Sequence, residues 1–147
     1  MPDSKNQGIE RSPRRILVTG GAGFIGSNFV HHWCSSYPDD RVVVLDALTY
    51  AGNKQTLASL EGGENFRFVQ GNICDRALVD SLLRSENIDT VAHFAAESHV
   101  DRSILGPEAF VQTNVIGTFT LLEAFRQQWI AKGQPAGDRF LHVSTDE

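Results

Sequence analysis

The stretch that decides the fold is Ile16-Leu17-Val18-Thr19-Gly20-Gly21-Ala22-Gly23-Phe24-Ile25-Gly26. It reads as a short strand, a cluster of glycines and the start of a helix. Gly21, Gly23 and Gly26 match the G-x-G-x-x-G fingerprint, and Gly20, Gly23 and Gly26 fit a wider G-x-x-G-x-x-G spacing. One glycine permits the tight turn, one lets the backbone approach a pyrophosphate, and one allows close helix–strand contact. The helix then points its amide hydrogens at the phosphates.

An acidic residue stands where this fingerprint requires one. Asp46 lies about twenty residues beyond Gly26, at the end of a second apolar strand. There it can accept both ribose hydroxyls of an adenosine and would repel a ribose phosphate, which favours NAD over NADP. Further along, Asn72 and Ile73 could hold the adenine, although an ordinary turn explains them equally well. His93 lies inside a strand and fits a core histidine better than a ligand.

Short apolar runs alternate with helix-period stretches along the rest of the chain. Strands are expected over residues 16–19, 41–45, 66–70, 90–94 and 139–144, and helices from about Phe24, after the capping Asp75, and from Pro107. This alternation predicts an α/β fold: a doubly wound, mostly parallel Rossmann-type sheet with helices on both faces. Because such a sheet usually has a sixth strand, we expect it to be truncated after the fifth. The last helix carries one apolar stripe: Val111, Val115, Thr118, Leu122, Phe125 and Trp129.

Composition narrows the class of protein. The chain has 147 residues, is 41% hydrophobic and 21% charged, and carries a net charge of -5. These values suit one globular domain, and the acidic balance argues against nucleic-acid binding. The sequence has no apolar run long enough to span a membrane. Cys34 and Cys74 lie outside any zinc-ligand spacing, so no metal is expected, and two isolated thiols favour a reducing cytoplasm.

Two regions are expected along the chain. Residues 1–15 mix acids and bases without an apolar core, which predicts a disordered N-terminal tail rather than a targeting signal. Residues 16–147 are expected to form an incomplete NAD-binding Rossmann domain that lacks a C-terminal substrate region.

Four segments together resemble a known enzyme family. They are residues 19–26, Leu45-Asp46-Ala47-Leu48-Thr49-Tyr50-Ala51-Gly52-Asn53, residues 94–103 (Phe-Ala-Ala-Glu-Ser-His-Val-Asp-Arg-Ser) and Ser144-Thr145-Asp146-Glu147. In this order they resemble the N-terminal part of the dTDP-glucose 4,6-dehydratases, which are lyases of the extended short-chain dehydrogenase/reductase family. The first segment is shared by the whole superfamily, whereas the other three are much more specific.

The resemblance implies a role for particular residues. Thr145, Asp146 and Glu147 would be catalytic, with Asp146 the general acid and Glu147 the general base. Ser98 and Thr145 would contact the sugar of the substrate. NAD would be held by Gly20, Gly23, Phe24, Ile25, Gly26, Asp46, Ala47, Leu48, Thr49, Asn72, Ile73, Phe94, Ala95, Ala96, Glu97, Ser98 and Thr113. Many family members have aspartate where Asn72 stands, which makes the adenine contact the least certain of these.

The resemblance also implies an activity and an assembly. The family dehydrates dTDP-glucose to dTDP-4-keto-6-deoxyglucose, using NAD that is recycled within each turnover, and is usually homodimeric through a four-helix bundle. Its oxidation step needs a Tyr-x-x-x-Lys pair after the fifth strand. Tyr50 and Lys54 have this spacing but follow the second strand, and Gly52-Asn53 between them indicates a turn. We therefore expect the chain alone to be an inactive N-terminal fragment.

Other readings remain open on the sequence alone. A UDP-sugar epimerase or decarboxylase of the same superfamily is disfavoured by residues 145–147. A stand-alone NAD-binding module, serving as a sensor, would explain the missing Tyr-x-x-x-Lys pair.

Overall fold

The computed structural model describes residues 11–144 and shows a five-stranded sheet with flanking helices. The strands are all parallel and lie in the order β3-β2-β1-β4-β5. This confirms the doubly wound Rossmann-type fold expected from the glycine fingerprint and the alternating elements. The strands are β1 (Arg15–Thr19), β2 (Arg41–Asp46), β3 (Phe66–Gln70), β4 (Thr90–His93) and β5 (Arg139–His142).

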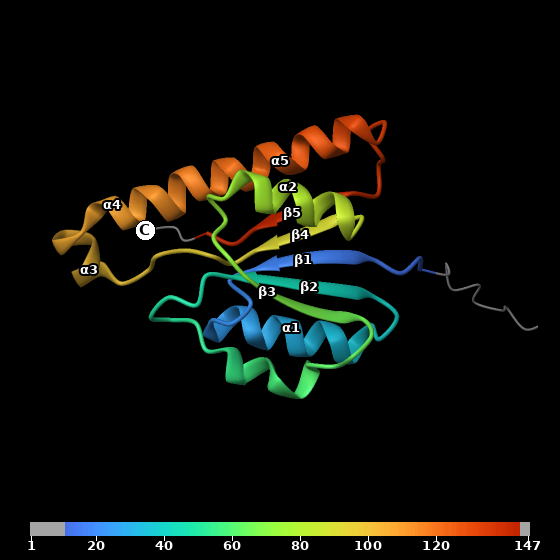
Figure 1. The fold of residues 1–147 in the computed structure, drawn as a ribbon, viewed down its shortest axis with the longest axis horizontal. Coiled ribbons are helices and arrows are strands. Elements are labelled where there is room, and N and C mark those ends of the chain that lie inside the picture. Colours follow the sequence, from blue (N-terminus) through green and yellow to red (C-terminus); the bar gives the residue numbers. More distant parts are fainter. Residues whose placement is uncertain (1–10, 145–147) are drawn as a thin grey trace, which may run out of the picture.

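Helices cover both faces of the sheet (Figure 1). One face carries α1 and the short 3-10 helix η1, and the other carries α2 and α5. Asp75 caps α2, as expected, because its side chain accepts a hydrogen bond from the Leu78 amide at 3.0 Å. The helices are α1 (Phe24–Ser36), η1 (Lys54–Leu60), α2 (Arg76–Ser85), α3 (Val100–Leu105), α4 (Pro107–Phe110), the π-helical η2 (Val111–Gly117) and α5 (Thr118–Ala131).

Alternate residues of the central strands supply two separate apolar cores. Ile16 and Val18 of β1 pack toward α1, whereas Leu17 between them packs toward α2 and α5. All three side chains are fully buried, as are Val42 to Leu45 of β2. Unbroken apolar runs are typical of strands with both faces covered, which is why the sequence shows no alternation there.

The long helical segment differs from the sequence expectation in two ways. Residues 100–105, between the expected fourth strand and the helix expected from Pro107, form the additional short helix α3. The segment from Pro107 runs on through the π-helical turns of η2, and the extra residue in those turns rotates the helix face. The expected apolar stripe is also divided between surface and core: Val111, Val115 and Leu122 are about half exposed, while Phe125 is buried.

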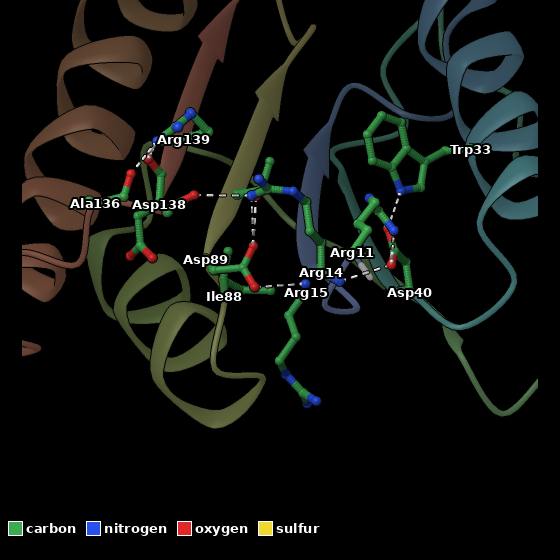
Figure 2. Close-up of polar contacts among 12 residues, drawn as sticks. Arg11, Arg14, Arg15, Trp33, Asp40, Ile88, Asp89, Ala136, Asp138 and Arg139 are labelled. Carbon is green, nitrogen blue, oxygen red and sulfur yellow. Dashed lines mark hydrogen bonds and ion pairs between the residues drawn. The ribbon is translucent and has the colours of Figure 1, made fainter. Parts of the chain in front are cut away.

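Charged residues tie the chain together at the amino ends of the strands (Figure 2). The expected tail over residues 1–15 ends earlier, because Arg15 already belongs to β1 and Arg11 pairs with Asp40. The Asp40 carboxylate, fully buried, accepts hydrogen bonds from the Arg14 amide and the Trp33 indole, both at 2.8 Å. Residues 1–10 lie outside the described part of the chain.

Asp40 should therefore make stability depend on acid pH. Burial raises the pKa of this carboxyl, but hydrogen bonds from Arg11, Arg14 and Trp33 outweigh burial and leave the pKa below its ordinary value. A lowered folded-state pKa means that the stabilisation is present above the unfolded-state pKa and is lost as the pH falls through the folded-state value.

We predict that Asp40→Ala lowers the free energy of unfolding by roughly 2–4 kcal/mol at pH 7, because three partly buried donors lose their buried acceptor. Urea unfolding at pH 7 and at pH 3, which lies below the ordinary aspartate pKa, measures this, and the variant should lose less stability between the two pH values than the parent. Asp39→Ala, which removes the neighbouring exposed carboxylate, is the control. Equal losses from both substitutions would contradict the prediction.

Candidate functional site

A cleft opens where the strand order reverses, at the carboxyl ends of β1, β2, β3 and β4. Open α/β sheets bind ligands at this point, because the loops leaving neighbouring strands diverge to opposite faces. The cleft holds about 640 Å³ of empty space, open solvent at its mouth included. It is lined by Gly20, Gly23, Leu45, Asp46, Ala47, Thr49, Ala51, Gly52, Gly71, Asn72, Ile73, Phe94, Ala95, Ala96, Glu97 and Thr113.

The glycine loop forms the floor of the cleft. Gly20 has a φ of 68°, and a Cβ there would lie 2.6 Å from the Ala95 amide nitrogen. Only glycine meets both conditions, because the left-handed backbone is costly for other residues and the adjacent backbone leaves no room. At Gly26 a Cβ would overlap the Gly20 carbonyl, so this residue permits close contact between α1 and the loop.

The start of α1 faces the same loop. Gly23 is its N-cap residue, and within the described chain no side chain caps the helix and no acidic residue lies in its first turn. The amide hydrogens of the first turn and the positive end of the helix dipole therefore favour an anion. This is the geometry that the sequence fingerprint predicts for a phosphate-binding loop.

Asp46 joins the glycine loop to the loop that follows β2. Its carboxylate accepts hydrogen bonds from the Ala22 amide at 2.9 Å and from the Leu48 amide at 2.8 Å. These contacts fix the loop after β2, where Leu48 takes the uncommon left-handed conformation with a φ of 53°. Two carboxylate oxygens offer about four acceptor positions, so further donors can still be accepted.

Residues of the loop after β3 line the cleft and also stabilise the loop itself. Asn72 lines the cleft, but its side-chain oxygen accepts a hydrogen bond from the Cys74 amide at 2.8 Å. This contact is an Asx turn, the ordinary alternative that the sequence left open. Ile73 is buried, and its side chain fills the space beside Gly117 of η2.

Asn114 fixes the loop that follows β4. This residue was not identified from the sequence. Its side chain accepts a hydrogen bond from the Glu97 amide at 2.8 Å and donates one to the Glu97 carbonyl at 2.9 Å. The π-helical turn of η2 carries both Asn114 and the cleft residue Thr113, and such turns occur frequently at functional sites. An asparagine inside an expected apolar helix was the available signal.

His93 links three elements beneath this loop. The ring is buried, with Nδ1 2.6 Å from the Thr19 hydroxyl and Nε2 2.8 Å from the Thr118 hydroxyl. Burial, with a smaller contribution from the nearby His142, lowers the pKa of His93 to about 4. The imidazole is therefore neutral at pH 7 and acts as a core residue, as the sequence indicated.

Most of the expected cofactor residues lie on the wall of this one cleft, but several do not. Phe24, Ile25, Leu48 and Ser98 are outside the lining, and Gly26 lies beneath the loop. Thr145, Asp146 and Glu147 fall outside the described residues. The sequence did not single out Leu45, Ala51, Gly52 and Gly71, which line the cleft as well.

Comparison with known proteins places the chain in a family. The family model described as GDP-mannose 4,6 dehydratase matches residues 17–147. The chain belongs to the GDP-mannose 4,6 dehydratase family.

Relatives within this family are dTDP-glucose 4,6-dehydratases. The enzyme of Xanthomonas campestris pv. campestris is 62% identical over 133 residues, which are 89% of this chain and 37% of the relative. That of Mycobacterium tuberculosis is 55% identical and is likewise covered over 37% of its length. The chain thus spans a little over a third of the relatives it matches.

Solved structures agree with this assignment. DesIV, a dTDP-glucose 4,6-dehydratase from Streptomyces venezuelae crystallised with NAD and TYD, is 52% identical with a TM-score of 0.77, over 90% of this chain and 40% of DesIV. The UDP-glucose 4-epimerase of Thermus thermophilus, in complex with NAD, is 34% identical with a TM-score of 0.66 over 77% of this chain and 34% of the epimerase.

Residues 11–144 contain neither a candidate metal site nor a membrane-spanning helix. No group of three or more His, Cys, Asp or Glu side chains there could hold a metal ion. No helix in the same range is long and apolar enough to cross a membrane.

The contact between Gly26 and the Gly20 carbonyl gives a direct test of the loop. Gly26→Ala should lower the free energy of unfolding by about 1–3 kcal/mol, because the added methyl forces α1 away from the loop. Thermal unfolding of the purified chain measures this. Gly137→Ala adds the same methyl where nothing lies within 4 Å and is the matched control. If both variants unfold like the parent, the close approach of helix and loop is wrong.

Proposed function

We propose that the chain is the NAD-binding, N-terminal part of a dTDP-glucose 4,6-dehydratase of the cytoplasm. The main support for this proposal is the cleft at the point where the strand order reverses, with a glycine loop as its floor and Asp46 at its edge. The dehydratases from Xanthomonas and Mycobacterium match the segment that builds the cleft. Cys34 and Cys74 are both free thiols, which supports a reducing compartment.

The residues of the cleft fit NAD. Gly20 and Gly23 leave room for a pyrophosphate beside the start of α1, where backbone amides would hold it. Asp46 would accept the ribose hydroxyls and repel a 2′-phosphate. Asn72 and Ile73 would hold the adenine, and Phe94, Ala95, Ala96, Glu97 and Thr113 would line the nicotinamide side. When bound, NAD supplies an acceptor and donor of hydride for the sugar.

The chain itself would supply an acid and a base at the same edge of the sheet. β5 runs parallel to β4, and the Val143 amide donates a hydrogen bond to the His93 carbonyl at 3.1 Å. The residues after β5 therefore leave the sheet at the end where the cleft opens. Asp146 would protonate the hydroxyl that leaves the sugar, and Glu147 would remove a proton from the carbon next to the one that bears this hydroxyl. Thr145 and Ser98 would bind the sugar.

The alternatives are a UDP-sugar epimerase or decarboxylase and a stand-alone NAD-binding module. The likeness to DesIV exceeds that to the Thermus epimerase in both identity and TM-score, which favours the dehydratase. The module remains the second candidate, because the chain holds no Tyr-x-x-x-Lys pair apart from Tyr50 and Lys54. Tyr50 lies in the loop after β2 and Lys54 starts η1, on the adenosine side.

The exposed apolar face of the long helical segment would join two copies of the protein. Val111, Val115, Phe119 and Leu122 are each about half exposed or more. They recur at intervals of four and three residues along η2 and α5, which places them on one side. Apolar patches of this kind mark association surfaces, and a homodimer through paired helices would cover this one.

Selectivity between the two dinucleotides tests the cofactor proposal. The chain should bind NAD at least about tenfold more tightly than NADP, because the Asp46 carboxylate repels the added phosphate. Asp46→Asn should reduce the preference for NAD over NADP. It should also weaken NAD binding itself, since one hydrogen-bond acceptor is lost. Calorimetric titration measures both affinities, with Glu108→Gln on α4 as the control that changes net charge equally. An unchanged ratio in Asp46→Asn would contradict the role of this residue.

A chimera tests the dehydratase proposal. The 147-residue chain alone should bind NAD without converting dTDP-glucose, because it lacks the Tyr-x-x-x-Lys pair that the oxidation requires. Fusing it to the remaining part of the Xanthomonas relative should give turnover, followed by NMR of the keto product. Asp146→Asn or Glu147→Gln in the chimera should then lower kcat about 10²- to 10⁴-fold. A folded, NAD-binding chimera without activity would favour the stand-alone module.

A further inference from the structure

Two loops rise on either side of the glycine loop and form opposite walls of the cleft. Residues 47–53 follow β2, and residues 94–99 follow β4 and lead into α3. β1 lies between these strands, so both loops flank the floor at Gly20 and Gly23. A ligand that rests on the glycine loop therefore lies between these two walls.

Three side chains from the two walls meet. The guanidinium carbon of Arg102, on α3, lies 3.7 Å from the centre of the Tyr50 ring. The ring of His99 lies 5.1 Å from the same Tyr50 ring, centre to centre, at an angle of 56°. None of the three lines the cleft itself, whereas their neighbours Thr49, Ala51 and Glu97 do. The contact therefore joins the two walls through side chains that lie outside the lining of the cleft.

We propose that Tyr50, His99 and Arg102 form a clasp that ties the two walls of the cleft together and slows exchange of the dinucleotide. The inference rests on the proposed function to the extent that a dinucleotide occupies the cleft. Tyr50 and Arg102 are then positioning residues, because neither lines the cleft.

The bases of the two walls are fixed independently of the clasp. The Asn53 amide donates a hydrogen bond to the Ala22 carbonyl at 3.0 Å, and Asn114 holds Glu97 through two hydrogen bonds. The clasp instead connects the parts of the walls that project beyond these anchors. Loss of the clasp should accordingly loosen the loop tips and leave the sheet and its cores intact.

The chemistry of the contact suits a reversible clasp. Tyr50 is 40% exposed, so its ring is held by this contact more than by burial. Arg102 takes part in none of the ion pairs among residues 11–144, and its guanidinium stacks on the ring instead. An exposed cation–π contact changes an equilibrium constant by a factor of about 2 to 5. The clasp is thus strong enough to bias the walls and weak enough to open.

The first measurement needs no cofactor. Hydrogen exchange of the free protein should show that Arg102→Gln speeds exchange about 2- to 5-fold in residues 47–53, although the substitution lies on the opposite wall. Tyr50→Leu should speed exchange in residues 97–105 in the same way. Tyr50→Phe keeps the ring and should behave like the parent. Arg126→Gln, which removes an exposed arginine of α5 that pairs with Glu123, is the matched control.

The second measurement concerns the dinucleotide. In a stopped-flow chase, Arg102→Gln and Tyr50→Leu should release NAD about 2- to 5-fold faster than the parent, Tyr50→Phe and Arg126→Gln. Unchanged exchange and unchanged release in Arg102→Gln and Tyr50→Leu would overturn the clasp while leaving NAD binding in place. A parent protein that binds no NAD would overturn the proposed function, and the hydrogen-exchange result would still decide whether the clasp joins the walls.

Discussion

The structure depends on one close approach of backbone to backbone, between Gly20 at the end of β1 and Ala95 beyond the end of β4. A single methyl group at Gly20 would lie 2.6 Å from the Ala95 nitrogen, so the two loops are in contact without any side chain between them. Because the strand order reverses between β1 and β4, this contact lies at the point where the cleft opens. The neighbouring wall is then set by Asp46, whose carboxylate binds backbone amides of both the glycine loop and its own loop.

Much of this arrangement was predictable because it rests on local chemistry. The glycine spacing and the unbroken apolar runs at Ile16–Val18 and Val42–Leu45 determine the strands, the turn and the edge of the sheet at which the cleft opens. The features that could not be predicted from the sequence depend on contacts between distant segments. Asn114, in the π-helical turns of η2, binds Glu97 in the loop after β4, and the apolar stripe of the same helical segment is divided between core and surface. A periodicity of 3.6 residues cannot foresee an inserted residue in a helix.

The same limit applies to residues that have both local and distant partners. Asn72 was expected to meet an adenine, and its oxygen also accepts a hydrogen bond from the Cys74 amide two residues on. Arg11 was expected in a tail, yet its guanidinium reaches Asp40 and the ring of Tyr37. In both positions the residue type allows more than one partner, and the contacts formed depend on the surrounding fold.

The two ends of the sheet differ in how they handle charge, and this difference bears on what the cleft can bind. At the amino ends, arginines gather but face carboxylates: Arg11 pairs with Asp40, Arg14 with Asp89, and Arg41 and Arg67 with Glu86. Four guanidinium groups share three carboxylates, so most of their positive charge is compensated within the protein. At the carboxyl ends no basic side chain lines the cleft between residues 11 and 144. An anionic ligand would be held there by glycine-loop amides and the dipole of α1, in a protein whose net charge is -5. Binding by fixed backbone dipoles needs an exact loop geometry rather than an excess of positive charge, which is why the glycines and Asp46 carry the site.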